Sequence, residues 1–214
     1  LNQEGLNIVT REDPVEYGID GINQVQVNPL AGLTFPAALR SILRQDPDIV
    51  MVGEIRDRET AEIAMGAAVT GHLVLSTIHA MDAPGAVTRL LHMGVPPHLL
   101  AGGLTGVVAQ RLVRTLCPDC RGKDSEGCAR CPDGYSGRTG VFQVMAVNDA
   151  IRDEILRGAS TSTLRRLAAE SGMASISEDA HRKVAEGVTS PHEIARGIQS
   201  DVGAVMPCEA CGSE

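Results

Sequence analysis

The feature that most constrains the fold of this chain is a short apolar segment, residues 49–52 (IVMV), that follows a helix-like stretch. It shows none of the alternation of a strand with one solvated face, and this is typical of a strand buried in a parallel sheet. Residues 6–9 (LNIV), ending at Thr10, and residues 73–78 (LVLSTI) are further strand candidates. Strands that alternate with helices along the chain predict an α/β fold with a mostly parallel sheet.

The stretches between these strands have helical spacing. Phe35, Ala38, Leu39 and Ile42 fall at positions i, i+3, i+4 and i+7, and Thr34 can cap the helix that they form. Further helices are expected over residues 60–69, 83–93 and 97–112.

The character of the chain changes at Cys117. The segment that follows is rich in Cys, Gly and Asp, whereas the pattern is helical from Asn148 onward, with a capping box expected at residues 190–193 (SPHE). We therefore expect a partial α/β core, a metal-organised loop, a helical region and an irregular tail. Their ranges are 1–115, 116–140, 141–200 and 201–214.

Composition narrows the class of partner. Of the 214 residues 43% are hydrophobic, enough for a real core, yet no apolar run approaches the roughly 20 residues of a bilayer helix. The formal net charge is −8, and only 2% of the residues are aromatic. Because nucleic-acid binding draws on clustered Lys and Arg and on aromatic stacking, no nucleic-acid partner is expected.

The six cysteines fall into three Cys-x-x-Cys pairs. Two pairs lie seven residues apart and can supply four thiolates to one Zn²⁺ in a closed, structural site. Gly122 and Gly127 permit the tight turns that this short spacing needs. The four residues are Cys117, Cys120, Cys128 and Cys131. The third pair, Cys208 and Cys211, is half a site, and the sequence leaves open whether another chain completes it.

Acidic residues follow two of the strand candidates. Glu54 comes directly after residues 49–52, and residues 12–16 (EDPVE) follow the first strand. Parallel strands bind ligands at their carboxyl ends, and two carboxylates beside an anionic ligand require a cation between them. His72 and His79 flank the third strand on opposite faces, and only His79 is placed to meet a phosphate, so His72 is expected to be structural.

Four ordered motifs resemble those of the secretion ATPases of type II secretion systems and type IV pilus assembly. Residues 44–57 (RQDPDIVMVGEIRD) resemble the family signature, and residues 10–17 (TREDPVEY) its Asp box. Residues 71–79 (GHLVLSTIH) resemble the His box, and residues 109–117 (AQRLVRTLC) the entry to a zinc-binding loop. The likeness extends over residues 6–198, nearly the whole chain.

This resemblance implies a RecA-like P-loop NTPase core with ATP and Mg²⁺ as ligands and a structural Zn²⁺ on the four cysteines. It further implies a cytoplasmic homo-hexamer, peripherally associated with the bacterial inner membrane, that acts on a platform protein there. Glu54 resembles the Walker B glutamate, Glu12 a second catalytic carboxylate with Glu16 as the fallback, and His79 the His-box residue near the γ-phosphate. Candidate arginines for phosphate charge or a subunit boundary are Arg40, Arg44 and Arg56. For Arg40 and Arg44, surface salt bridges are an equal alternative.

The chain departs from the family pattern in one respect. It contains no G-x-x-x-x-G-K-[S/T] loop, since its only Gly-Lys pair, Gly122-Lys123, is followed by Asp124. Family members carry this loop just before the helix that leads into the first strand, and Leu1-Asn2 resembles the end of that helix. The chain is therefore expected to be a C-terminal fragment that, alone, binds ATP weakly or not at all and does not hydrolyse it.

Two other functions are weighed against the ATPase. A non-enzymatic, zinc-stabilised scaffold or interaction module of the same fold is favoured if Leu1 is the true start. A zinc hydrolase using His72, His79 and Asp82 is disfavoured, because no H-E-x-x-H occurs and a four-thiolate zinc has no open position. Within the family, the cysteine loop argues against retraction-type pilus motors and leaves secretion and pilus assembly open.

Overall fold

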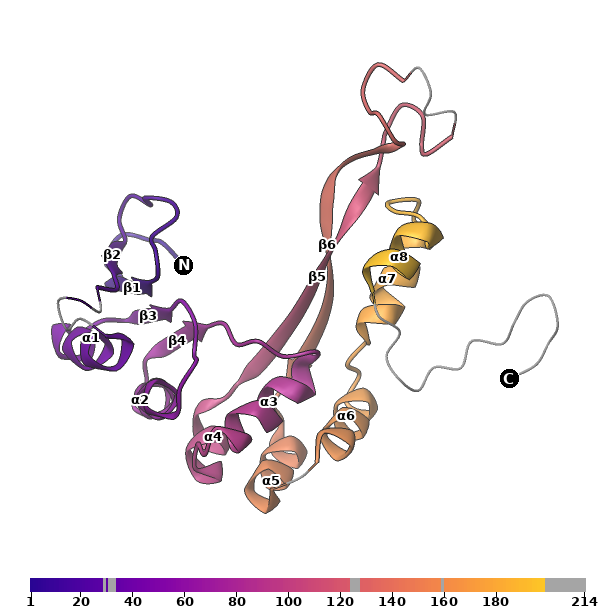
Figure 1. The fold of residues 1–214 in the computed structure, drawn as a ribbon. Coiled ribbons are helices and arrows are strands. Elements are labelled where there is room, and N and C mark those ends of the chain that lie inside the picture. Colours follow the sequence, from indigo (N-terminus) through magenta and orange to yellow (C-terminus); the bar gives the residue numbers. More distant parts are fainter. Residues whose placement is uncertain (29, 31–33, 124–127, 159, 199–214) are drawn as a thin grey trace. The chain divides into compact units, whose positions relative to one another are not determined.

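The computed structural model describes residues 1–28, 30, 34–123, 128–158 and 160–198 (Figure 1). The chain forms two compact units. The first comprises Leu1–Val107 and Met145–Ser171, and the second comprises Val108–Val144 and the described residues from Gly172 onward. Each unit is thus assembled from segments far apart in sequence. The division into a partial core (1–115), a metal-organised loop (116–140) and a helical region (141–200) stays a prediction, and the tail predicted over 201–214 lies outside the described residues.

A parallel four-stranded sheet lies at the centre of the first unit. Its strand order is β2 (Asn23–Gln26), β1 (Ile8–Glu12), β3 (Ile49–Val52) and β4 (Leu73–Ser76). All three pairings are parallel, as the sequence predicts. Because every strand runs in the same direction, the residues at their carboxyl ends gather along one edge of the sheet.

Two helices, α1 (Phe35–Ile42) and α2 (Arg58–Val69), cover one face of this sheet (Figure 1). Helix α1 contacts β1, α2 contacts β4, and the two helices contact each other. Each begins at a side-chain cap, Thr34 for α1 and Asp57 for α2. Both helices were predicted from the sequence, with α2 starting two residues earlier than expected.

Four more helices complete the first unit, namely α3 (Ala83–His92), α4 (Pro97–Gly103), α5 (Asp149–Arg157) and α6 (Thr161–Glu170). Helix α4 packs against α2 and α5, and α3 packs against α6. Asp82 caps α3, and its Oδ2 accepts a hydrogen bond from Arg165 Nη2 of α6 at 2.6 Å. The Asp82 carboxylate is therefore engaged in a helix–helix ion pair, which argues further against a role as a zinc ligand.

The helix predicted over residues 97–112 is wrong beyond residue 103. Helix α4 ends at Gly103, and the chain continues as β5 (Gly106–Leu116). Gly103 lies so close to α2 that a Cβ there would stand 2.9 Å from a backbone oxygen of that helix. In β5 exposed positions alternate with covered ones, and the exposed Val108 and Leu112 also fit a helical spacing of four. This double fit made the strand resemble a helix in the sequence.

Other strand boundaries also differ from the prediction. Strand β1 extends through Glu12, so that this carboxylate ends the strand instead of following it. Strand β4 ends at Ser76, two residues early. Strands β2 and β6 (Tyr135–Ala146) were not expected, because short polar or glycine-containing segments give weak strand signals.

The second unit is built on the two-stranded sheet of β5 and β6. Helices α7 (Ile176–Ala185) and α8 (Pro191–Gly197) contact each other, and both contribute to its core. The helical region predicted after Asn148 is thus present as α5 to α8. The buried core residues are Val113, Val141, Ile176, Ala180 and Ile194.

A buried ion pair joins α8 to β5 within this unit. Only 4% of the Glu193 side chain is exposed, and its carboxylate accepts hydrogen bonds from Arg114 Nη2 at 2.7 Å and Nε at 2.9 Å. Arg114 also pairs with Asp133 at 2.5 Å and lies 4.0 Å from the ring centroid of Tyr135. These bonds, opposed by desolvation, lower the pKa of Glu193. Ser190 caps α8 as predicted, but the Glu193 carboxylate is turned to Arg114 and does not complete the predicted capping box.

A second buried carboxylate, Asp179 of α7, holds this helix to β6. Burial disfavours its charge, but hydrogen bonds from Lys183 Nζ at 2.7 Å, from the Phe142 amide at 2.9 Å and from Arg182 outweigh this. Together they lower the pKa of Asp179 to about 2. The carboxylate is therefore charged in the folded chain at any pH well above that value.

Stability is expected to depend on Asp179 over an acidic pH window. A group whose pKa is depressed on folding stabilises the fold above its unfolded pKa of about 4, and the contribution disappears as the pH falls through the folded value. For Asp179 this amounts to about 2 kcal/mol at neutral pH. We expect Asp179→Asn to lower the free energy of unfolding by about this amount near pH 6 and to converge with wild type only below about pH 2.

Urea unfolding followed by circular dichroism at several pH values measures this difference. Taking the difference between variant and wild type removes acid effects that both share. The matched control is Asp153→Asn, which changes an exposed aspartate of α5 and is expected to leave the pH dependence unaltered. A constant difference between Asp179→Asn and wild type across the range would contradict the prediction.

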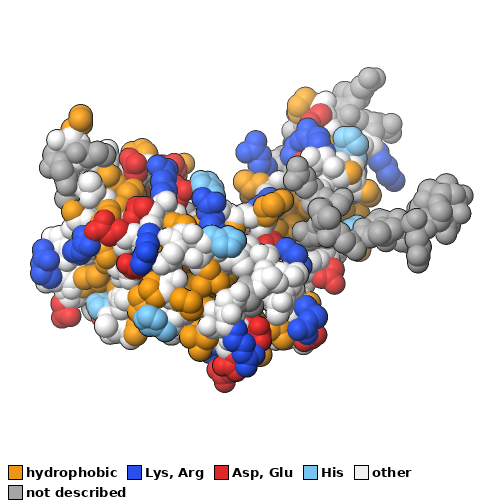
Figure 2. All heavy atoms as spheres, turned by 60° about the horizontal axis from the view of Figure 1, so that its bottom comes forward, with side chains coloured by type: hydrophobic (Ala, Val, Ile, Leu, Met, Phe, Trp, Pro, Cys, Tyr) orange, Lys and Arg blue, Asp and Glu red, His pale blue; other side chains and the backbone are white. Residues whose placement is uncertain are grey.

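Basic and acidic side chains are interspersed on the face drawn in Figure 2. Several of the helices carry surface ion pairs, such as Arg157–Glu154 at 2.5 Å and Arg166–Glu170 at 2.7 Å. Each exposed ion pair of this kind contributes little to the free energy of folding, so the buried pairs of Glu193 and Asp179 matter more for stability. None of the helices in the described part of the chain has the length and apolarity that crossing a membrane requires.

Candidate functional site

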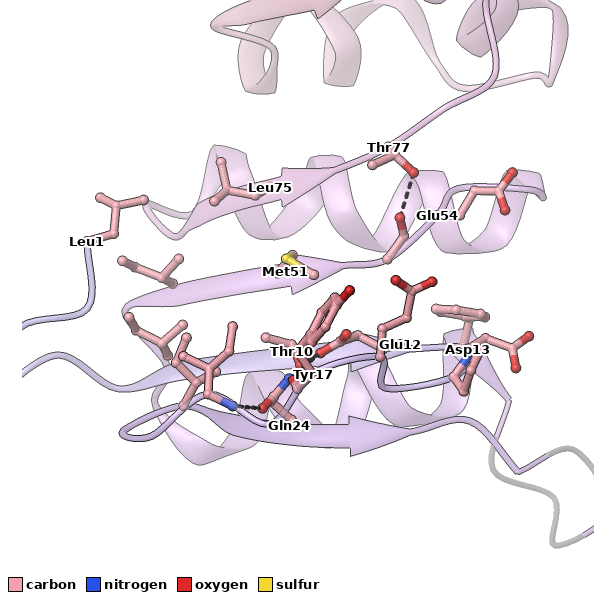
Figure 3. A pocket seen from close by; sticks show the side chains of 18 of the residues that line it. Leu1, Thr10, Glu12, Asp13, Tyr17, Gln24, Met51, Glu54, Leu75 and Thr77 are labelled. Atoms are coloured by element: carbon pink, nitrogen blue, oxygen red, sulfur yellow. Dashed lines mark hydrogen bonds between the residues drawn. The ribbon is translucent and has the colours of Figure 1, made fainter. Parts of the chain in front are cut away.

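A cavity of about 560 Å³ lies over the sheet face that α1 and α2 leave uncovered (Figure 3). Its floor is formed by alternate residues of the strands, among them Thr10, Met51 and Leu75, and it extends to the carboxyl ends of β1 and β3. Two glutamates stand at that end, Glu12 and Glu54 (Figure 3). The floor is thus largely apolar and the carboxyl end is acidic.

The end of β3 brings Glu54 to this edge through a close approach of two strands. The Gly53 amide donates to the Arg11 carbonyl of β1 at 2.7 Å, and a Cβ on Gly53 would stand 3.0 Å from that oxygen. A side chain at position 53 would push the strands apart. From the other side, the Thr77 hydroxyl donates to the Gly53 carbonyl at 2.6 Å. Glycine is therefore needed to place Glu54 beside β1.

The Glu54 carboxylate is held by two partners. Its Oε1 lies 3.0 Å from His79 Nε2, and its Oε2 accepts from Arg56 Nε at 2.6 Å. The Glu54 side chain is 17% exposed, whereas that of His79 is 85% exposed. Glu54 thus lies within the site, with one cation and one imidazole at its rim.

Glu12 is oriented by hydrogen bonds to a single oxygen. Its Oε1 accepts from the Thr10 hydroxyl at 2.5 Å and from Gln24 Nε2 at 3.0 Å. Arg11 pairs with Val52 in the register of β1 and β3, so Glu12 stands close to the turn that carries Glu54. Two carboxylates at one rim can hold a divalent cation or activate a water molecule.

The structure brings together four of the six catalytic and nucleotide-binding candidates. Glu12, Glu54, Arg56 and His79 line the cavity, as does the fallback Glu16. Arg40 and Arg44 are not among the described residues that line it. Arg40 instead forms a surface ion pair with Glu59 at 2.6 Å, and Arg44 is exposed in a 3-10 turn.

His72 lies at the other end of β4 from His79. Its Nδ1 is 3.0 Å from the Ala67 carbonyl and 3.3 Å from the Thr70 hydroxyl, at the end of α2. These contacts fit the structural role expected for it. A zinc site shared by His72 and His79 is therefore not supported.

Sequence reasoning missed the uncharged residues that organise this site. Gln24 and Thr10 orient Glu12, and Thr77 braces the turn before Glu54. All three line the cavity. For Thr10 the sequence did offer an indication, because side chains alternate along a strand and residues 10 and 12 therefore lie on the same face. For Gln24 there was none, because β2 was not predicted.

The four predicted zinc ligands converge in the second unit. Their Sγ atoms all lie within 4.8 Å of one another, with Cys117–Cys128 at 3.9 Å and Cys120–Cys131 at 3.5 Å. Four sulfurs at about 2.3 Å from a tetrahedral zinc ion stand about 3.8 Å apart. The cluster thus has the donors and the spacing that a structural zinc ion needs.

A backbone hydrogen bond favours the thiolate at one position of the cluster, and burial opposes it at another. The backbone amide of Arg130, above all, lowers the pKa of Cys128 to about 7, whereas burial raises that of Cys131 to about 12. Zinc binds thiolates, so its affinity should fall in acid. Gly122, with φ of 76°, makes the predicted turn, whereas Gly127, Cys208 and Cys211 lie outside the described residues.

Both the sequence and the fold have relatives among known proteins. A family model described as "Type II/IV secretion system protein" matches residues 1–196. The chain is 53% identical over 202 residues to the type II secretion system protein HxcR of Pseudomonas aeruginosa, covering 92% of this chain and 43% of that protein. It is 45% identical over 228 residues to the type IV pilus assembly ATPase PilB of Myxococcus xanthus, covering 94% and 40%.

Among solved structures, the pilus retraction motor PilT with bound ADP superposes with a TM-score of 0.69 at 28% identity, covering 91% of this chain and 53% of that one. The chain spans less than half the length of the curated relatives described above. The RecA-like fold predicted from the motifs is thus supported both by sequence and by structure.

Proposed function

Because the chain belongs to the type II/IV secretion system protein family, we propose that it is the C-terminal part of an ATPase that drives type II protein secretion or type IV pilus assembly. The observation that carries this proposal is the convergence of Glu12, Glu54 and His79 on one cavity at the carboxyl edge of a parallel sheet. Nucleotide hydrolases of this fold class hold phosphates, metal and attacking water at that edge.

The site residues have distinct roles in this proposal. Glu54 orients the attacking water and takes its proton, since its largely covered carboxylate stands at the carboxyl edge of the sheet with the His79 imidazole 3.0 Å away. Glu12 is the second catalytic carboxylate, placed to help hold the magnesium ion, and Glu16 is the alternative residue for this role. A magnesium ion bound with ATP would offset phosphate charge and order the phosphate oxygens.

The uncovered sheet face supports a further part of the proposal. Leu73 and Leu75 of β4 are 42% and 40% exposed, and Met51 and Ile49 line the same open cavity. Apolar sheet faces are normally covered by helices in α/β proteins. We propose that in the intact protein an upstream segment with the phosphate-binding loop covers this face, and that the 214 residues alone do not hydrolyse ATP.

The assembly is also a proposal. The intact protein would form a hexamer on the cytoplasmic side of the inner membrane, bound to a platform protein there. Arg40, Arg44 and Arg56 would meet phosphates or a subunit boundary, at the cost of the surface pair that Arg40 makes with Glu59. The four clustered cysteines would hold one structural zinc ion per chain.

The proposal is tested by comparing the 214-residue chain with a complete protein that carries the upstream segment. We expect the complete protein to hydrolyse Mg-ATP and the chain alone to show no binding in a calorimetric titration up to millimolar nucleotide. Micromolar affinity of the chain would overturn its proposed inactivity. A complete protein without ATPase activity would overturn the main function and leave the zinc-stabilised scaffold as the working hypothesis.

A further inference from the structure

Gln24 of β2 uses both ends of its amide on the segment that carries the acidic residues. Its Oε1 accepts from the Ile19 backbone amide at 2.7 Å, which fixes the orientation of the side chain (Figure 3). Its Nε2 donates to the Tyr17 carbonyl at 2.8 Å and to Glu12 Oε1 at 3.0 Å. One side chain thus contacts Glu12 and two points of the segment that follows it.

The strand register explains why Gln24 can reach Glu12. Thr10 and Gln24 are partners in the parallel pairing of β1 and β2, and Glu12 is the next residue of β1 on the same face. Thr10 and Gln24 therefore donate to the same Glu12 oxygen, Oε1, from neighbouring strands. This pair of bonds fixes the rotamer of Glu12 and leaves Oε2 to face the cavity.

The same side chain restrains the segment from residue 13 to residue 19. Glu16 and Tyr17, both exposed, lie in this segment and line the cavity. Without the bonds of Gln24 to Tyr17 and Ile19, the loop would lose two of its anchors to the sheet. The cavity wall and the Glu12 carboxylate thus depend on one residue.

We propose that Gln24 is a positioning residue for Glu12, acting through a neutral amide donor. This rests on the proposed ATPase function of the site. A carboxylate in place of the amide would keep the acceptor for Ile19 but would lose the donor and place a second negative charge beside Glu12. Two negatively charged carboxylates repel each other at this distance, so the Glu12 side chain would turn away from its position.

The test is Gln24→Glu in the complete protein, with Asn23→Asp as the matched control on the same strand. Asn23 pairs with Val9 and so lies on the opposite face of β2 from Gln24. Its side chain donates to Asn7 Oδ1 at 3.3 Å and is not among the described residues that line the cavity. Near pH 8 we expect Gln24→Glu to lower kcat about 10²-fold with little change in KM, as loss of orientation does. Asn23→Asp should stay within about threefold of wild type.

A pH profile separates positioning from a general loss of structure. Once protonated, the carboxyl group that Gln24→Glu introduces can again donate to Glu12. The activity of this variant relative to wild type should therefore rise as the pH falls toward about 5.5. A ratio that stays flat with pH, or an equal loss in Asn23→Asp, would overturn the proposal.

A second measurement does not depend on ATPase activity. In the 214-residue chain, hydrogen exchange of residues 13–19 should quicken by at least about tenfold in Gln24→Leu and remain unchanged in Asn23→Leu, since the Asn23 side chain bonds to Asn7 and not to that segment. Unchanged exchange in Gln24→Leu would overturn the positioning role. If the wild-type complete protein hydrolyses no ATP while exchange changes as expected, the proposed function fails and the structural part of the inference stands.

Discussion

Replacing Glu54 by glutamine in the complete protein is expected to lower the turnover number for Mg-ATP by about 10²–10⁴-fold, the range associated with loss of a general base. Glutamine has nearly the same shape, so it can keep a hydrogen bond to His79 and to Arg56. It cannot accept a proton from water, and the replacement removes the negative charge that pairs with Arg56 and lies beside His79. Nucleotide affinity should change much less than turnover, because phosphate binding does not depend on the proton acceptor.

The matched control for this prediction is Glu62→Gln. Glu62 lies eight residues further on, in α2, and pairs with Arg58 on the surface at 2.7 Å. It should therefore leave turnover within about twofold of wild type. Steady-state ATPase assays with a separate nucleotide-binding measurement distinguish the two effects. Turnover of Glu54→Gln within about threefold of wild type would show that another group activates water.

The acidic residues at the carboxyl edge of the sheet were predictable because the strands before them follow a strong pattern. The wholly apolar segment before Glu54 marks a buried parallel strand, and a parallel strand can deliver its next residues only to the carboxyl edge of the sheet. The position of Glu12 followed from the same reasoning, although the structure places it within β1 and not after it. The contact between His79 and Glu54 depends on β4 lying next to β3 in the sheet, an order of strands that the sequence suggests but does not establish.

The predictions that were wrong or missing also have physical reasons. Strand β5 carries apolar residues at spacings that suit both a strand and a helix, and only its packing in the second unit decides between them. Strand β2 is four residues long with two glutamines, so its identity comes from pairing with β1. The role of Gln24 was therefore out of reach, because it depends on register between strands. Likewise, the partner of Glu193 lies 79 residues away, beyond any local capping pattern.

The cysteine cluster differs from the acidic edge of the sheet, because the four predicted zinc ligands were identifiable from spacing alone and the structure brings all four together. We expect Cys131→Ser to lower bound zinc from about one ion per chain to well below half, since a serine hydroxyl is rarely deprotonated and is a poor zinc ligand. Cys131 is buried and its sulfur lies 3.5 Å from that of Cys120, so the replacement leaves an incomplete site. Asp133 lies two residues beyond Cys131 and pairs with Arg114, so loss of the metal would also disturb this ion pair. We therefore expect the melting temperature to fall by about 10 °C.

The control for the zinc prediction is Cys208→Ser, a chemically identical change in the remaining pair of cysteines. Four thiolates already complete a tetrahedral shell, so this variant should keep one zinc ion and the wild-type melting temperature. Metal content by mass spectrometry of the intact folded chain, together with thermal unfolding with and without a chelator, measures both quantities. Zinc retained by Cys131→Ser, or lost from Cys208→Ser, would show that the ligand set is not the four clustered cysteines. If wild type holds no zinc and a chelator leaves its melting temperature unchanged, hydrogen bonds and burial alone stabilise the loop, and the metal has no structural role in this chain.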